Sequence, residues 1–235
     1  MIRFCVLSIT FALLLSSNLN AQNSDGDKPL RHLVFFDFVE GIDDSSVSDI
    51  VDTFNGLPSK ISSITDFQSG KNDSPEGLDD GFTHAFAVSF KDQAGLKAYG
   101  PDPAHQDLVK KLKGKTDSVF VFDYLGSKDA KVDSASAGVK HFVFFKFKDD
   151  ADPQGVLAVE EAFAALTSKI DTITGFEWGK RVGGTKGDGF THAFVVAFAD
   201  DAGRAEYLPH PEHQAFVGVL KPVLDKVRVI DFTNP

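Results

Sequence analysis

The amino-acid sequence contains one domain-sized pattern twice, and this internal repeat constrains the fold more than any other feature. Five motifs recur in the same order at an offset of 109 residues (32 to 141), which falls by one in a single loop. They pair HLVFFDF with HFVFFKF, KISSITDFQSGK with KIDTITGFEWGK, GFTHAFAVSF with GFTHAFVVAF, YGPDPAHQ with YLPHPEHQ, and VFVFDY with VRVIDF. The sequence therefore predicts two copies of one fold, residues 30–125 and 139–233. Residues 126–138 between them are mostly small and polar, which is typical of an exposed linker.

The hydrophobic periodicity of each copy predicts the element order β-α-β-β-α-β. Two strands with a crossover helix, repeated once, form the split βαβ unit of the ferredoxin-like class. We therefore expect an α+β fold with one four-stranded antiparallel sheet per copy. In the first copy the expected strands are 31–39, 64–70, 82–90 and 118–125, and the expected helices are 45–57 and 92–113.

The first strand of each copy is apolar on both faces. In HLVFFDFV, alternation places Val34 and Phe36 on one face and Leu33 and Phe35 on the other. Two helices cover only one face of a sheet, so the other face needs a further layer. The sheet of the other copy can supply it. We expect an intramolecular pseudo-dimer, with the two sheets face to face or closed into an alpha/beta barrel.

Six of the seven histidines pair under the repeat: His32 with His141, His84 with His192, and His105 with His213. We expect the first and third strands to be parallel neighbours, with His32 and His84 at the same end of the sheet. The following helix, about 20 Å long over 13 residues, would return His105 to that end. Tyr99 would line the same groove, and the helix should break between its two prolines.

These residue types suit either acid–base chemistry or plain burial. An imidazole titrates near pH 6.5, a tyrosine hydroxyl can polarise a carbonyl, and the apolar face could seat an acyl chain. Alternatively, His84 and His192 are buried and satisfied by neighbours. A metal site of His192, His210 and His213, or a weaker one of Asp102 with His105, is a further alternative. No carboxylate that would orient such ligands can be identified, so no metal and no cofactor are expected.

The strings KHFVFFKF, GFTHAF, YLPHPEHQ and VRVIDF resemble the stress-responsive alpha/beta barrel (Dabb) domain family over both copies. The resemblance implies dimeric ferredoxin-like barrels. Its olivetolic acid cyclase type closes a polyketide chain by an intramolecular aldol reaction, using a strand-one His, a strand-three His, a Tyr and a closing His. By motif these positions are His141, His192, Tyr207 and His213, and in the weaker first copy His32, His84, Tyr99 and His105. The second copy is the stronger match because it keeps HPEH where the first has DPAH.

The start of the sequence predicts export. Residues 1–21 combine Arg3, an apolar run and a cleavage position after Ala21, as in a secretory signal peptide. The run is shorter than the roughly 20 residues that cross a bilayer, so we expect a secreted or periplasmic protein. Cys5 is the only cysteine, which excludes disulfides and thiolate-zinc sites from the processed chain. A net charge of -10 disfavours nucleic acid and anionic membranes as partners.

Three functions from different classes remain. The prediction is an exported stress-response A/B barrel protein that binds a small apolar ligand or protects against stress. The first alternative is a polyketide cyclase-like lyase that uses His and Tyr in acid–base catalysis. The second is a structural assembly unit with a filled core and no pocket.

Overall fold

The computed structural model describes residues 28–127, 129–183 and 187–234, so the expected signal peptide at 1–21 lies outside the described residues. In the first repeat the elements are β1 (Leu30–Phe38), α1 (Asp44–Asn55), the 3-10 helix η2 (Leu57–Ser59), β2 (Ile64–Lys71), β3 (His84–Phe90), α2 (Gln93–Tyr99), α3 (Pro103–Leu112) and β4 (Thr116–Leu125). In the second they are β5 (Gly138–Phe147), α4 (Pro153–Ala165), η3 (Leu166–Ser168), β6 (Ile173–Lys180), β7 (His192–Phe198), α5 (Asp201–Tyr207), α6 (Pro211–Leu220) and β8 (Leu224–Asn234). Among these residues, no helix has the length and apolar character needed to cross a membrane.

Each repeat forms one antiparallel sheet, in the order β2-β3-β1-β4 and β6-β7-β5-β8. This confirms the ferredoxin-like α+β class. The expectation that the first and third strands are parallel was wrong, because β1 and β3 are antiparallel neighbours. His32 lies opposite Val88 and His84 lies opposite Phe36. The two histidines are therefore four positions apart along the sheet, about 13 Å.

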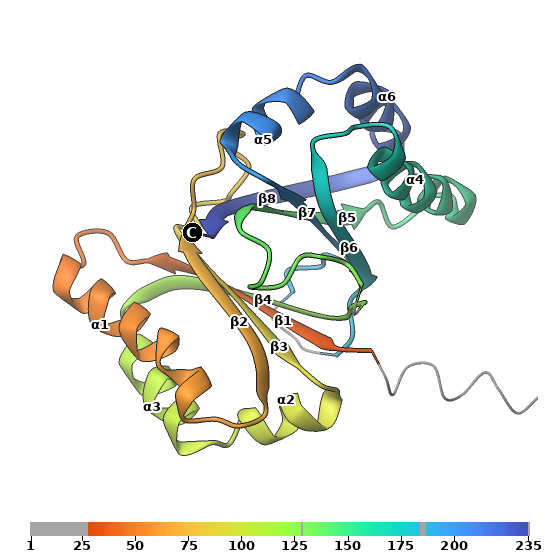
Figure 1. Cartoon of the computed structure of the whole chain (residues 1–235). Helices are drawn as coiled ribbons and strands as arrows, with labels where there is room; N and C mark the ends of the chain where they lie inside the picture. The colour runs from red at the N-terminus through yellow and green to blue at the C-terminus, as the bar shows by residue number, and fades with distance from the viewer. Residues whose placement is uncertain (1–27, 128, 184–186, 235) are drawn as a thin grey trace, which may run out of the picture.

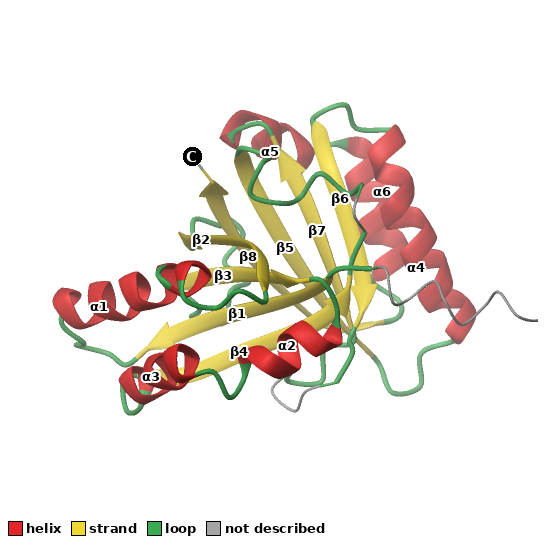
Figure 2. Ribbon diagram, turned by 60° about the horizontal axis from the view of Figure 1, so that its bottom comes forward, coloured by secondary structure: helices red, strands yellow, loops and turns green. Residues whose placement is uncertain are grey.

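The two sheets pack against each other, and each is covered by its own helices on the outer side (Figures 1 and 2). The shared core is built largely of phenylalanine: the ring centroids of Phe35 and Phe120 lie 5.4 and 4.9 Å from that of Phe144. Alternate residues such as Val34 and Phe36 face the helices of their own repeat. The doubly apolar strands are thus buried on both faces, and the predicted pseudo-dimer is confirmed.

The long helix expected at 92–113 is two helices. Asp102 ends the break by accepting a hydrogen bond from the Ala104 backbone N–H at 2.8 Å, and Pro103 occupies the first position of α3, where it requires no N–H partner. The break lies between Tyr99, the last residue of α2, and His105, in the first turn of α3. It turns both side chains towards the same space.

The segment 126–138 was expected to be exposed, and the structure corrects this in part: residues such as Ser127, Asp129 and Lys131 are exposed, but others are buried. Ala130 and Val132 are buried in the core between the sheets. The Ala130 carbonyl accepts a hydrogen bond from the Phe176 backbone N–H at 3.0 Å, and the Val132 carbonyl accepts one from Gln68 at 2.9 Å. A Cβ added to Gly175 would lie 2.2 Å from a backbone oxygen of this segment. The linker therefore packs across β2 and β6, and the side chains of Ala130 and Val132 fill space between the sheets. The sequence did not indicate this, because the residues around these two are polar.

Candidate functional site

The first repeat brings three of its predicted site residues together. Tyr99 lies between the two histidines, with ring centroids 5.7 Å from His32 and 4.2 Å from His105. His32 comes from β1, Tyr99 from the end of α2, and His105 from the start of α3. His84 is not part of this cluster, as the antiparallel register requires.

Hydrogen bonds orient the rings of the two histidines. His105 Nδ1 lies 2.9 Å from the Gly100 carbonyl oxygen; because a carbonyl only accepts, Nδ1 donates and Nε2 keeps its lone pair. His32 Nδ1 lies 2.6 Å from a carboxylate oxygen of Asp123, which orients its ring in the same manner. Burial lowers the pKa of His105, so the neutral imidazole predominates near pH 7 and Nε2 can accept a proton. Burial raises the pKa of Tyr99 far above its ordinary value, so its hydroxyl acts as a donor.

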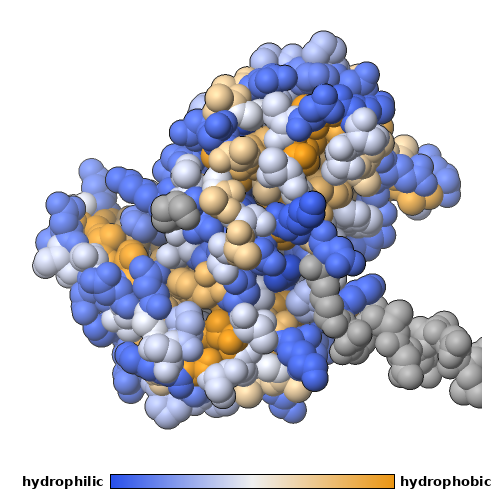
Figure 3. Space-filling view, viewed as in Figure 1, coloured by the Kyte–Doolittle hydropathy of each residue, from blue (hydrophilic) through white to orange (hydrophobic). Residues whose placement is uncertain are grey.

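A cavity of about 580 Å³ begins at this cluster. Its apolar walls come from β1, β4, α1 and α3 and include Val34, Phe36, Phe54, Leu108 and Val121. His32, Tyr99 and His105 supply polar atoms at one end. Figure 3 shows hydrophobic residues at the surface of this repeat, the lower-left lobe, among hydrophilic ones. A volume of this size suits a small organic molecule, because ligand pockets usually span about 300–1,000 Å³.

The second repeat builds the same cluster but fills the space beside it. Tyr207 lies 5.8 Å from His141 and 4.4 Å from His213, measured between ring centroids. Phe216, 108 positions after Leu108, lies 6.3 Å from Phe145 and 4.5 Å from Phe163. Phe145 and Phe163 correspond to two walls of the first cavity, Phe36 and Phe54. The larger Phe216 ring therefore occupies the space that Leu108 leaves open. The filled space lies in the second repeat, which has the stronger motif match.

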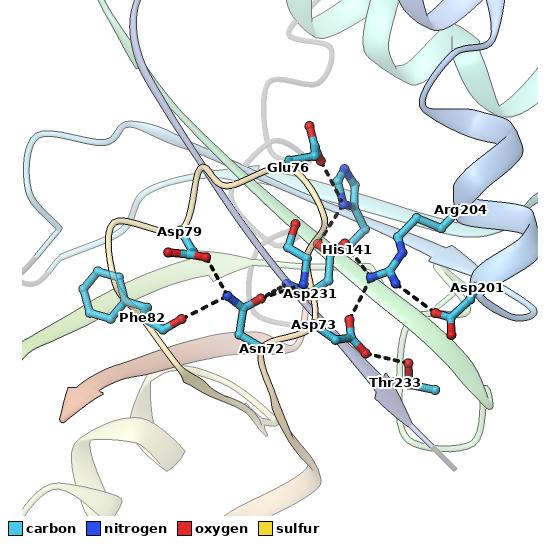
Figure 4. Close-up of polar contacts among 11 residues, drawn as sticks. Asn72, Asp73, Glu76, Asp79, Phe82, His141, Asp201, Arg204, Asp231 and Thr233 are labelled. Carbon is cyan, nitrogen blue, oxygen red and sulfur yellow. Dashed lines mark hydrogen bonds and ion pairs between the residues drawn. The ribbon is translucent and has the colours of Figure 1, made fainter. Parts of the chain in front are cut away.

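The second cluster is also covered by a loop of the first repeat, residues 72–81 (Figure 4). Arg204 Nη1 donates to Asp73 at 2.7 Å and to Asp231 at 2.9 Å. His141 Nδ1 lies 2.8 Å from Asp231 and 3.8 Å from Glu76 Oε1. Burial alone would lower the pKa of His141, but Asp231 and Glu76 outweigh it and raise that pKa. These charges tie the two repeats together over His141.

The first cluster has apolar neighbours at the matching positions. Leu96 stands where the second repeat has Arg204, and Val182 from the loop after β6 packs with it. The Val182 backbone N–H donates to the Asp123 carbonyl at 2.8 Å. The two halves thus share the His–Asp pair and differ in what covers it.

The strand-three histidines have other neighbours. His192 Nε2 lies 3.0 Å from Glu160, and its ring stacks on Trp178 at 6.2 Å between centroids. His84 Nδ1 lies 2.9 Å from Thr83 Oγ1, and its ring meets Phe38 edge-on at 5.2 Å. His192 thus fits the alternative of a buried histidine satisfied by neighbours, whereas His84 is only part-buried. Each of the two also lines a surface pocket of its own, of about 670 Å³ at His192 and about 490 Å³ at His84.

The metal alternative finds no support in the geometry. His210 caps α6 by accepting from the Glu212 N–H at 3.2 Å, while His213 Nδ1 donates to the Leu208 carbonyl at 2.9 Å. His192 Nε2 is already paired with Glu160 Oε1. Within residues 28–127, 129–183 and 187–234 no group of three or more metal-ligating side chains is present.

Sequence reasoning missed several residues that shape the sites. Asp123 and Asp231 occupy the same place in the motifs VFVFDY and VRVIDF, so the alignment of the repeats could have identified them. The difference between Leu108 and Phe216 is equally visible in the alignment. Glu76 could not be assigned, because residues 72–79 of its loop share no identical residue with the aligned loop of the other repeat.

Comparisons with known proteins agree with this architecture. Residues 30–125 and 139–234 each match the Stress responsive A/B Barrel Domain. A stress-response A/B barrel domain-containing protein of Arabidopsis thaliana is 37% identical over 100 residues, covering 42% of this chain and 87% of that protein. Olivetolic acid cyclase of Cannabis sativa is 23% identical over 99 residues, covering 42% of this chain and 98% of the cyclase. Each of these relatives therefore spans about one repeat.

Some solved structures are similar to this chain over both repeats. A monooxygenase candidate from Fusobacterium nucleatum has a TM-score of 0.64 at 9% identity, covering 88% of this chain and 92% of that one. At such low identity the likeness shows the fold alone. It extends across the arrangement of two ferredoxin-like units in one chain.

Proposed function

Because the chain belongs to the stress-responsive A/B barrel domain family, which matches both of its repeats, we propose that it is an exported module that binds a small apolar ligand in its first repeat. The cavity of about 580 Å³ carries this proposal. Its walls are apolar and its polar groups are gathered at one end, which is the usual design of a small-molecule site. Export is supported by the signal-like residues 1–21.

The second repeat supports the proposal by contrast. Leu108 and Phe216 are equivalent positions, and each is almost fully buried against its own sheet. A phenylalanine is therefore compatible with this fold at this place. Protein interiors normally leave few voids larger than a water molecule. The fold could fill this space with a phenylalanine, but the first repeat has a leucine there and keeps the space open.

The test is to fill that space. Leu108→Phe should abolish binding of the neutral fluorescent probe N-phenyl-1-naphthylamine, or weaken it at least tenfold, while the melting temperature stays near that of the natural protein. The probe becomes fluorescent in apolar surroundings, so titration measures binding directly.

The matched control is Leu157→Phe on α4, where the leucine is 43% exposed and belongs to the second repeat. It makes the same substitution away from the cavity and should leave probe binding unchanged. Equal binding by Leu108→Phe and the natural protein would contradict the proposal, and so would equal loss in both variants.

Acid–base catalysis in the same cavity is the second candidate. His105 and Tyr99 favour it, because one presents an unprotonated Nε2 and the other a hydroxyl that remains protonated. For cleavage of a β-hydroxyketone, His105 Nε2 would take the hydroxyl proton as the carbon–carbon bond breaks. Tyr99 would hold the enolate oxygen, and the proton would return to carbon.

A fluorogenic β-hydroxyketone, which releases a fluorescent aldehyde on retro-aldol cleavage, tests this candidate. Turnover should disappear in His105→Ala and persist in His213→Ala, because His105 lines the apolar cavity of the first repeat, whereas Phe216 fills the corresponding space beside His213. Turnover lost equally in both variants would contradict the assignment to the first repeat. The third reading, an assembly unit without a pocket, would gain support if neither probe nor substrate bound.

A further inference from the structure

The end of α3 carries a lysine cluster that the second repeat lacks. We define the cluster as Lys110, Lys111, Lys113 and Lys115, within the sequence KKLKGK. The second repeat reads GVLKPV at residues 218–223 and has one lysine there. The chain as a whole has a net charge of -10. The repeat with the cavity is therefore also the repeat with a local positive charge.

Two members of the lysine cluster line the cavity itself. Lys110 and Lys113 belong to its wall, and no aspartate or glutamate does. Lys110 pairs with Asp107 at 2.9 Å, but both side chains are largely exposed, so the pair is weak. Lys113 has no ion-pair or hydrogen-bonding partner for its side chain within the described part of the chain.

The other two members connect the helices beside the mouth. Lys111 donates to Asp49 at 2.6 Å, and Lys115 donates to Ser46 Oγ at 3.1 Å. Both partners belong to α1. The first bond joins α3 to α1, and the second joins the residue before β4 to α1. They leave Lys110 and Lys113 as the cations that face a ligand.

The cavity has different chemistry at its two ends. His105 and Lys113 are eight positions apart, which is about 12 Å along a helix. Leu108, Val109 and Leu112 line the stretch between them. A bound molecule would therefore contact neutral hydrogen-bonding groups at the inner end, an apolar wall in the middle and ammonium groups at the outer end.

Favourable interaction with the helix dipole explains only part of this pattern. Lysines near a helix C-terminus are stabilising on any exposed helix. However, α3 and α6 have the same length, 10 residues, and the same place in the fold. Only the helix beside the open cavity has the lysine cluster.

We propose that the ligand of the first repeat is an amphipathic anion of the medium-chain carboxylate type. Its apolar chain lies along α3 and its carboxylate meets Lys110 and Lys113 at the mouth. This inference rests on the proposed function, since it specifies the ligand class of the same cavity.

The experiment compares dodecanoate with dodecan-1-ol, which has the same chain and no charge. Each displaces N-phenyl-1-naphthylamine from the full protein, at concentrations below micelle formation and at two salt concentrations. Dodecanoate should compete about five- to tenfold more strongly, and this advantage should shrink at high salt. Lys110→Gln combined with Lys113→Gln should remove the advantage and leave dodecan-1-ol unaffected.

Lys221→Gln is the matched control for Lys113→Gln, because the two lysines hold the same position in the two repeats. It should leave both competitors unchanged. Equal competition by acid and alcohol, or an unchanged acid advantage in the double variant, would overturn the inference while the binding function stands. Failure of the probe itself to bind the natural protein would refute the proposed function, and with it this ligand class.

Discussion

Removing the charge of Asp231 should destabilise the protein far more than removing the charge of Asp123, its counterpart in the first repeat. The Asp231 side chain is fully buried and accepts hydrogen bonds from both His141 and Arg204. Asp123 is 11% exposed, and the ion pair it makes is with His32. Asp231→Asn leaves a buried guanidinium and an imidazole without their shared carboxylate, which should cost about 3–5 kcal/mol. Asp123→Asn should cost about 1–2 kcal/mol.

Urea unfolding and calorimetry measure this difference. For a chain of this size, the larger cost corresponds to a fall in melting temperature of roughly 6–20 °C and the smaller one to roughly 2–8 °C. Trp178 is the only tryptophan and lies in β6, so its fluorescence reports on the second repeat. An equal loss of unfolding free energy in Asp231→Asn and Asp123→Asn would refute the argument that burial and Arg204 make the Asp231 charge more important.

The stability lost in Asp231→Asn should also depend on pH. The folded protein raises the pKa of His141: burial would lower it, but Asp231 and Glu76 outweigh that effect. Stability from the charged imidazole is therefore fully present below about pH 6.5 and is lost as pH rises through the raised value. The deficit of Asp231→Asn should shrink over that range but not vanish, because Arg204 remains charged. A deficit that grows with pH would contradict this assignment.

Three further substitutions test other parts of the structure. Phe216→Leu should cost about 1–2 kcal/mol in urea unfolding and add a second binding site for the neutral probe by calorimetric titration, since it recreates the first cavity. Val132→Ala should cost about 2 kcal/mol in the same unfolding assay, whereas an exposed linker would show no change. Glu177→Gln, which removes the buried carboxylate bound by Arg31 and Tyr124, should cost about 3 kcal/mol by calorimetry; a change below 1 kcal/mol would contradict its role.

The fold could be predicted because its signals are local and occur twice. The motif HLVFFDFV shows by alternation alone that both faces of β1 are buried, and the second sheet follows from that. The direction of β3 was misjudged because alternation says which face a residue occupies but not which way the strand runs. Topology alone decides that His84 lies four positions from His32 across the sheet.

The site was harder to predict because its properties depend on the size of individual side chains and on contacts between the repeats. The motif HPEH ranked the second repeat higher, but its extra His210 only caps a helix. One ring, Phe216 in place of Leu108, decides which repeat has space beside its cluster of two histidines and a tyrosine. The loop 72–81 reaches across to His141 from the other repeat, and no pattern within either repeat indicates such a contact.

The buried linker also determines how the molecule responds to dilution. Two separate barrel subunits would dissociate at low concentration, because their association depends on mass action. Here the halves are joined by a short segment that is itself packed between them, so each meets the other at an effective concentration in the millimolar range. The paired sheets and the ion network across them therefore persist at any protein concentration. The two halves are also free to differ, as their unequal sites show, because no symmetry requires a change in one to appear in the other.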